Sequence, residues 1–308
     1  MIYEIVNDAL LKEIKEQKFS CEKELQKLCE ANLKQLINLE FIVSEFIVAN
    51  FKLDTLAFDA QANAFVIIEY KNDRNASVID QGYTYLSIML NHKADFVLKY
   101  NHQFMQNKDI KDFDWSQSRV VFISPNFTKY QINSINFKDL PIELWKIKKH
   151  SNRTLTFEQV IATDASQSIK NIAPITETSA TQQVSRVTKT YSERELIEGV
   201  SDNILDIYNE LKDYILGLND SIVLTPTKLY IGFNRGRKSI FSIEFQKNSL
   251  LLWLNINVHA INDPKKIIRD VSSISHHGNG DCEIKISDTK DIGYIEDILK
   301  DVVEQIVE

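Results

Sequence analysis

The 308-residue sequence contains few of the residues that interrupt regular structure, with only eight glycines and five prolines. Long flexible linkers therefore cannot be common, and we expect most of the chain to form helices and strands. Three cysteines, an odd number without a CxxC pair, exclude a disulfide framework and a zinc ribbon. We interpret Cys21, Cys29 and Cys282 as buried packing residues.

Long hydrophobic runs are also missing, since no stretch approaches the 18 apolar residues of a membrane span. The first 18 residues carry acids inside their apolar run and have no small-residue cleavage site, which argues against a signal peptide. These absences predict a soluble cytoplasmic protein without a membrane partner. No P-loop, GxGxxG or GxSxG motif occurs, so nucleotide hydrolysis, dinucleotide binding and serine hydrolysis have no support.

Positive charge is not in excess, because 36 Lys and Arg stand against 43 Asp and Glu, a net charge of −7. Residues 1–190 carry 23 charges of each sign, so the acidic excess lies entirely in residues 191–308. A nucleic-acid-binding surface would therefore have to be local and lie in the first part of the chain.

Composition divides the chain into two domains. The hydrophobic content of 44% is enough for one large core or two ordinary ones. Residues 163–190 are rich in Ser, Thr and Gln and cannot supply a core. We therefore predict a larger domain at 1–160, a linker at 161–190 and a smaller domain at 191–308.

Hydrophobic periodicity indicates an α/β layered first domain, with a mixed sheet flanked by helices. Helical spacing is predicted at 3–18, 20–37 and 77–91, and strands at 41–48, 52–58, 64–71, 94–100, 119–124 and 142–148.

The second domain reads as a smaller α+β unit of accessory function. Ser192 is expected to cap one long amphipathic helix that runs to residue 218. A short helix is expected from Asp263-Pro264, and a final helix ends the chain. Strands are predicted at 229–234, 239–246, 249–257 and 282–287.

Two local features of the second domain, a histidine pair and a basic cluster, can each be explained by structure alone or by a function. His276-His277 could suggest a metal site, but adjacent histidines point apart and the following Gly-Asn-Gly favours a loop. The basic cluster at 235–238 could touch a phosphate backbone, yet a solvated hairpin tip is the favoured interpretation.

The segment FVIIEYK is apolar on both alternating faces, so it predicts a central strand buried on both sides. Glu69 and Lys71 interrupt its end and point the same way, which is costly without partners. Asp54 interrupts the preceding strand, and the DAQANA stretch suits a hairpin turn that would bring Asp54 beside Glu69.

Two carboxylates and an amine at a strand end suit a hard divalent cation, Mg²⁺ or Mn²⁺, with water and a substrate phosphate in the remaining positions. Lys71 would orient the attacking water or neutralise charge in the transition state. The plain alternative is a structural ion pair between Glu69 and Lys71 at the rim of the sheet.

Three segments together resemble the PD-(D/E)XK nuclease superfamily: Asp54, then IIEYK at 67–71, then QGYTY at 81–85. The likeness is to a bacterial nuclease-like branch with LQ..E.NL in its first helix, here EKELQKLCEANL at 22–33. Leu53 replaces the proline of the superfamily name. The second domain resembles a domain of unknown function found at the C-terminus of such proteins.

This resemblance implies a restriction-endonuclease-like core in which Asp54 and Glu69 bind the metal and Lys71 is catalytic. Glu22 is a candidate third ligand, or else an acid favoured by the helix dipole. Gln81 is a further candidate catalytic residue one helical turn from Tyr85, for which packing is favoured. Glu45 is either a rim residue or a support of the site.

The leading hypothesis is a magnesium-dependent endonuclease or exonuclease that hydrolyses DNA phosphodiester bonds. A non-catalytic module that binds nucleic acid or a protein, and a structural protein that assembles through its second domain, are the alternatives. DNA versus RNA, defence versus repair, and assembly into a homo-oligomer stay open at this point.

The composition of residues 163–190 also generates a test. Limited proteolysis of the whole protein should cut first in this stretch and release two folded pieces. Mass spectrometry of the fragments would locate the cut. If 163–190 resists cleavage and the first cut falls elsewhere, the predicted domain boundary is wrong.

Overall fold

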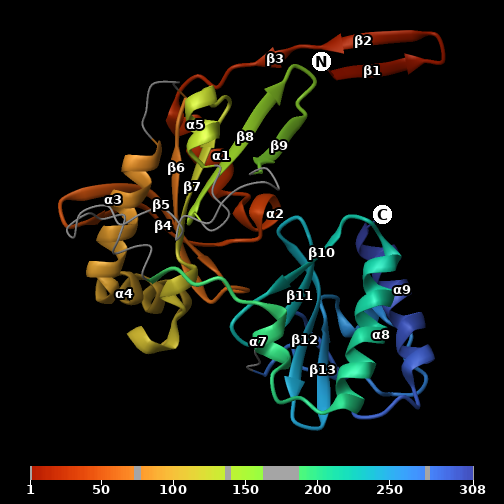
Figure 1. Ribbon diagram of the computed structural model, residues 1–308. Coiled ribbons are helices and arrows are strands. Elements are labelled where there is room, and N and C mark those ends of the chain that lie inside the picture. The colour runs from red at the N-terminus through yellow and green to blue at the C-terminus, as the bar shows by residue number, and fades with distance from the viewer. Residues whose placement is uncertain (1, 73–77, 136–139, 162–186, 275–277, 308) are drawn as a thin grey trace. The chain divides into compact units, whose positions relative to one another are not determined.

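The structure, a computed structural model, describes residues 2–72, 78–135, 140–161, 187–274 and 278–307 (Figure 1). Its chain divides into two compact units, Met1–Thr190 and Tyr191–Glu308, each with its own hydrophobic core. Each unit is considered by itself.

A seven-stranded mixed sheet forms the centre of the first unit. Its order is β3-β8-β7-β6-β5-β4, with β9 also paired to β8. The strands β4, β5 and β6 are antiparallel, whereas β6, β7 and β8 run parallel. The bounds are β3 (Glu16–Gln17), β4 (Glu40–Val48), β5 (Phe51–Asp59), β6 (Ala64–Tyr70), β7 (Arg119–Ser124), β8 (Ile142–His150) and β9 (Leu155–Val160).

Helices cover both faces of this sheet. One apolar cluster joins the sheet to α1 (Glu22–Glu30) and α2 (Leu33–Ile37). A second joins the opposite face to α3 (Val78–Asn91) and α4 (Lys93–Phe104), with α5 (Lys129–Ser134) against α3. Two short 3₁₀ turns, η1 (Ile110–Asp112) and η2 (Trp115–Gln117), precede β7. The mixed sheet flanked by helices that the sequence predicts is thus confirmed.

Strand β6 lies in the middle of the sheet and every residue of it is buried. Phe65 and Ile67 pack in the cluster with α3 and α4, whereas Val66, Ile68 and Tyr70 pack in the cluster with α1 and α2. Because side chains alternate along a strand, Glu69 falls on the α3 face.

The hairpin between β5 and β6 forms where the sequence predicts it. Asp59 pairs with Ala64 across a four-residue turn. The Asp59 carboxylate accepts the backbone N–H of Ala62, and Asn63 takes the left-handed conformation at φ 50°. This turn fixes the register of the two strands that carry Asp54 and Glu69.

Two predictions for the first unit were wrong. Residues 3–18 form strands, β1 (Ile2–Asn7), β2 (Leu10–Ile14) and β3, rather than a helix. Cross-strand pairs such as Ile5 with Leu11 stabilise this hairpin, whose side chains are mostly exposed, so no core selects the helical period. The apolar residues at 94–100 belong to helix α4, because Phe96, Tyr100 and Phe104 lie one turn apart and meet the core.

The second unit is an antiparallel six-stranded sheet that packs on α8 and α9, which confirms the predicted α+β class. Its order is β10-β11-β12-β13-β15-β14. The bounds are α7 (Glu193–Ile197), α8 (Asp202–Leu218), β10 (Ile222–Pro226), β11 (Ile231–Arg235), β12 (Lys238–Gln246), β13 (Ser249–Leu254), η4 (Val258–Ala260), β14 (Arg269–Asp270), β15 (Cys282–Ile286) and α9 (Ile292–Val307).

The expected single helix at 192–218 is in fact two, because Gly199 takes φ 79° and ends the first of them. Ser192 does cap α7, through a capping box with Glu195. No helix begins at Asp263. Its carboxylate instead accepts the N–H of Ile268 and the hydroxyl of Tyr294, which stabilises a loop.

The predicted linker falls mainly on residues 162–186, which lie outside the described residues. Within 187–190, Val187 packs against the first core and Lys189 exchanges hydrogen bonds with Ser116 and Gln117, so this end belongs to the first unit. Cys29 and Cys282 are buried as expected, but Cys21 is exposed. Among the described helices, none has both the length and the apolar character of a membrane span.

Glycine positions in the second unit allow a paired stability test. A Cβ on Gly280, at φ 127°, would lie 2.2 Å from the backbone oxygen of Leu254. Gly280→Ala should therefore destabilise the unit by about 2 kcal/mol or more in urea unfolding. Gly217→Ala, in helix α8 with nothing within 4 Å, is the control and should stabilise by about 0.5–1 kcal/mol. Equal effects of the two changes would contradict this account.

Candidate active site

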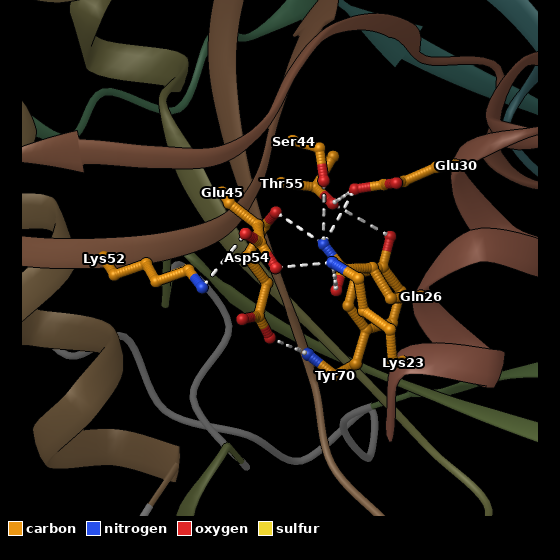
Figure 2. Close-up of polar contacts among 9 residues, drawn as sticks. All are labelled: Lys23, Gln26, Glu30, Ser44, Glu45, Lys52, Asp54, Thr55 and Tyr70. Carbon is orange, nitrogen blue, oxygen red and sulfur yellow. Dashed lines mark hydrogen bonds and ion pairs between the residues drawn. The ribbon is translucent and has the colours of Figure 1, made fainter. Parts of the chain in front are cut away.

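Asp54 and Glu69 lie beside each other at the ends of β5 and β6. The antiparallel register pairs Thr55 of β5 with Ile68 of β6. The next residues along, Asp54 on β5 and Glu69 on β6, therefore lie across from each other. The Asp54 Oδ2 atom accepts the backbone N–H of Tyr70 at 3.0 Å, which directs this carboxylate toward β6 (Figure 2). The hairpin thus places the two acids as neighbours.

Glu69 is the most deeply buried acid of the group, with 6% of its side chain exposed. Its Oε1 atom accepts hydrogen bonds from Lys71 Nζ and from Gln81 Nε2, each at 2.7 Å. Its Oε2 atom is buried and has no hydrogen-bond partner among the described residues. Lys71 and Gln81 therefore bind the same oxygen of Glu69.

Helix α3 supplies the side chains above Glu69. Gln81 and Tyr85 lie one turn apart, and Gln81 Nε2 also donates to the Tyr85 hydroxyl at 2.7 Å. Burial, followed by the charge of Glu69, raises the pKa of Tyr85, so its hydroxyl stays protonated at neutral pH. Tyr85 is also buried in the α3 core, as the packing interpretation expects.

Ionisation of Asp54 is unfavourable in this site. Burial and then the charge of Glu69 raise the pKa of Asp54 from 3.8 to about 6, against the opposing effects of the Tyr70 N–H and Lys71. The carboxylate of Asp54 thus repels its neighbour when no cation is present.

Glu22 and Glu45 have other partners. Glu22 lies on the opposite helical layer, and its Oε1 accepts the N–H of Asn72 at 2.9 Å. The charge of Glu22 raises the pKa of Asp54 less than burial and the charge of Glu69 do. Its role as a third metal ligand stays a prediction. Glu45 forms ion pairs with Lys23 and Lys52 at the edge of the sheet.

The donor set suits a divalent cation that keeps much of its water. The described residues hold no group of three or more His, Cys, Asp or Glu arranged for a metal ion. Mg²⁺ characteristically uses one or two carboxylates together with waters and substrate phosphates. Asp54 and the free Oε2 of Glu69 fit that pattern, whereas they would not form the closed cage of a structural zinc or calcium site.

The sequence analysis contained Gln26 only as part of the first-helix motif and gave it no role, whereas its side chain reaches Asp54 from helix α1. Its side chain is buried and its Nε2 donates to the backbone oxygen of Asp54 at 2.8 Å. The available signal was a polar residue next to Leu25 on the apolar side of a predicted helix.

The other candidates are not part of this site. The basic cluster forms the tip of the β11–β12 hairpin, where Arg235 pairs with Lys238. His276 and His277 lie outside the described residues. Arg119, which the sequence analysis also missed, forms a buried ion-pair group with Asp59 and Glu143.

A protein of Haemophilus influenzae, described as uncharacterised, is 40% identical to this chain over 294 residues and covers 96% of both. The chain belongs to the family of that protein. Residues 193–302 match the model of a domain of unknown function, DUF5655, which corresponds to most of the second unit.

Two solved structures share part of the fold at low similarity. A complex of EndoMS with dsDNA covers 42% of this chain at 16% identity and a TM-score of 0.29. A repair endonuclease from Pyrococcus abyssi covers 43% at 18% identity and a TM-score of 0.25. The chain spans about half of each of these proteins, 47% and 50%. At these TM-scores the likeness carries no argument about the activity of this chain.

The raised pKa of Asp54 predicts a pH-dependent stability in chelator. Between pH 3.8 and about 6 the folded state retains a proton that the unfolded state has released, so the wild type loses stability as pH rises. Asp54→Asn removes this loss. The variant should match wild type near pH 3.5 and exceed it by about 2 kcal/mol at pH 8 in urea unfolding.

Asp291→Asn is the control, because the pKa of Asp291 is shifted in the opposite direction to that of Asp54. A hydrogen bond from Lys265 lowers the pKa of Asp291, so its loss should not stabilise the protein at pH 8. An Asp54→Asn advantage that is the same at both pH values would contradict the raised pKa of Asp54.

Proposed function

We propose that this protein is a metal-dependent nuclease that hydrolyses phosphodiester bonds of DNA. The observation that carries the proposal is the convergence of Asp54, Glu69 and Lys71 at one end of the central sheet, where Glu69 Oε2 is buried and has no hydrogen-bond partner among the described residues. A buried polar atom without a partner costs free energy, and a bound cation would offset that cost. The resemblance to PD-(D/E)XK nucleases supports DNA as the substrate class.

Asp54 and Glu69 would hold Mg²⁺ or Mn²⁺. When bound, the cation would supply Lewis acidity toward the phosphodiester and lower the pKa of a coordinated water. Glu69 presents Oε2 for this purpose because Lys71 and Gln81 already occupy Oε1. Gln81 thereby orients the carboxylate of Glu69.

Lys71 would act on the substrate directly. Its ammonium group lies 2.7 Å from Glu69 and its side chain is 18% exposed, so it is held in place yet accessible. From this position it can orient a water by hydrogen bonding or neutralise a phosphate oxygen as charge develops in the transition state.

A non-catalytic module that binds nucleic acid or a protein partner is the second candidate. The observation that favours it is the ion pair between Glu69 and Lys71, in which the two side chains satisfy each other. A structural pair of this kind would persist in a protein that retains the fold without its chemistry.

Cleavage assays on the full-length protein separate the two candidates. Wild type should degrade linear single- or double-stranded DNA with Mg²⁺ or Mn²⁺, measured by fragment release on gels. Asp54→Ala should abolish cleavage because it removes a metal ligand. Lys71→Ala should lower the rate by a factor on the order of 10²–10³ because one contact to the transition state is lost.

Lys212→Ala is the matched control, since Lys212 also pairs with a glutamate, Glu193 at 3.0 Å, but in the second unit. It should leave cleavage unchanged. If wild type cleaves no DNA or RNA with either metal, the catalytic proposal fails and the binding module replaces it.

A further inference from the structure

The backbone of β5 leaves the regular ladder at Asp54. On the β4 side, Ser44 pairs with Thr55 and Phe46 with Leu53, but the register omits Glu45 and Asp54 between them. Glu45 takes a left-handed conformation at φ 53°, which an extended ladder cannot accommodate. At this interruption the carbonyl of Asp54 has a side-chain partner.

Gln26 provides that partner from helix α1, on the face of the sheet opposite α3 (Figure 2). Its Nε2 lies 2.8 Å from Asp54 O, and within 2.9 Å of Glu30 Oε1 and 3.1 Å of Ser44 Oγ. Its Oε1 accepts from Lys23 Nζ at 3.0 Å. The acceptors on one side and the ammonium on the other fix the orientation of the amide.

The surroundings of Gln26 are buried and hydrogen-bonded. Its side chain is 5% exposed, and Thr55 and Tyr70 beside it are fully buried. Thr55 Oγ1 donates to Glu30 Oε1 at 2.6 Å and also lies 3.3 Å from the Tyr70 hydroxyl. An apolar residue could pack here as well, so the buried amide needs a reason beyond filling space.

We infer that Gln26 is a positioning residue for the metal site. It donates to the main-chain carbonyl of Asp54 and so fixes the main chain that aims the Asp54 carboxylate toward Glu69. The inference rests on the proposed function, because it concerns the same metal site. Gln26 does not touch the cation or the substrate. It acts through the carbonyl of Asp54.

The test measures Mn²⁺ affinity by calorimetry on the whole protein, without substrate. Gln26→Met keeps the side-chain volume but loses both N–H donors, and it should weaken Mn²⁺ binding by about 10-fold, the low end for partners of metal ligands. Gln26→Glu keeps the shape and the acceptor for Lys23, yet it cannot donate, and it should lose affinity too. Gln26→Asn is the milder variant if Gln26→Met does not fold, which thermal unfolding reports.

Gln131→Met is the matched control. Gln131 is also buried, and it caps α5 in a box with Thr128 rather than contacting β5. It should lose stability but bind Mn²⁺ as wild type does. In cleavage assays Gln26→Met should raise the Mg²⁺ concentration for half-maximal rate by the same factor as the loss of affinity, with little change in the rate at saturating metal.

Wild-type Mn²⁺ affinity in the folded Gln26 variants, or an equal loss in Gln131→Met, would overturn the inference. Failure of wild type to bind Mn²⁺ at all would also overturn it. Wild type that binds Mn²⁺ but cleaves nothing would refute the proposed nuclease activity alone, since the affinities of the variants would still decide the role of Gln26.

Discussion

A carboxylate buried at the end of the central strand is the constraint on which the rest of the first unit depends. Strand β6 is covered on both faces, and Glu69 at its end is 5% exposed. A charge in such a place is costly unless it is paired and hydrogen-bonded. Lys71 and Gln81 both donate hydrogen bonds to Oε1 of Glu69. Because Gln81 lies on α3, this helix has to pack over the end of β6.

The same end of the sheet is irregular where Asp54 enters it. Two side chains make bonds to the backbone here: the Asp54 carboxylate accepts Tyr70 N–H, and Gln26 donates to Asp54 O. Across from Asp54 on the β4 side, Glu45 takes a left-handed conformation at φ 53°. Lys23 and Lys52 hold Glu45 by ion pairs, so the irregularity is supported from both sides. Deviations of this kind persist only where surrounding groups determine them.

Much of this could be predicted from the sequence, for identifiable reasons. Strand β6 is an uninterrupted apolar run, and the turn residues before it fix its pairing with β5, so Asp54 and Glu69 could be placed as neighbours. Gln81 followed from helical spacing. The β1–β2 hairpin and α4 were missed because short apolar runs fit both a helix and a strand until their packing is known. Gln26 stands in the quoted first-helix motif, but its role was missed because its partner is a main-chain carbonyl, which a pattern of side chains does not reveal.

The ion pair between Glu69 and Lys71 at first favours a structural interpretation, but the atoms involved argue otherwise. Lys71 and Gln81 both contact Oε1, and neither contacts the buried Oε2. A pair selected only for stability would be expected to satisfy both oxygens, because an unsatisfied buried acceptor loses the hydration it had in the unfolded state. The contacts of Lys71 and Gln81 are concentrated on one oxygen of Glu69, so the ion pair alone does not account for the burial of the other.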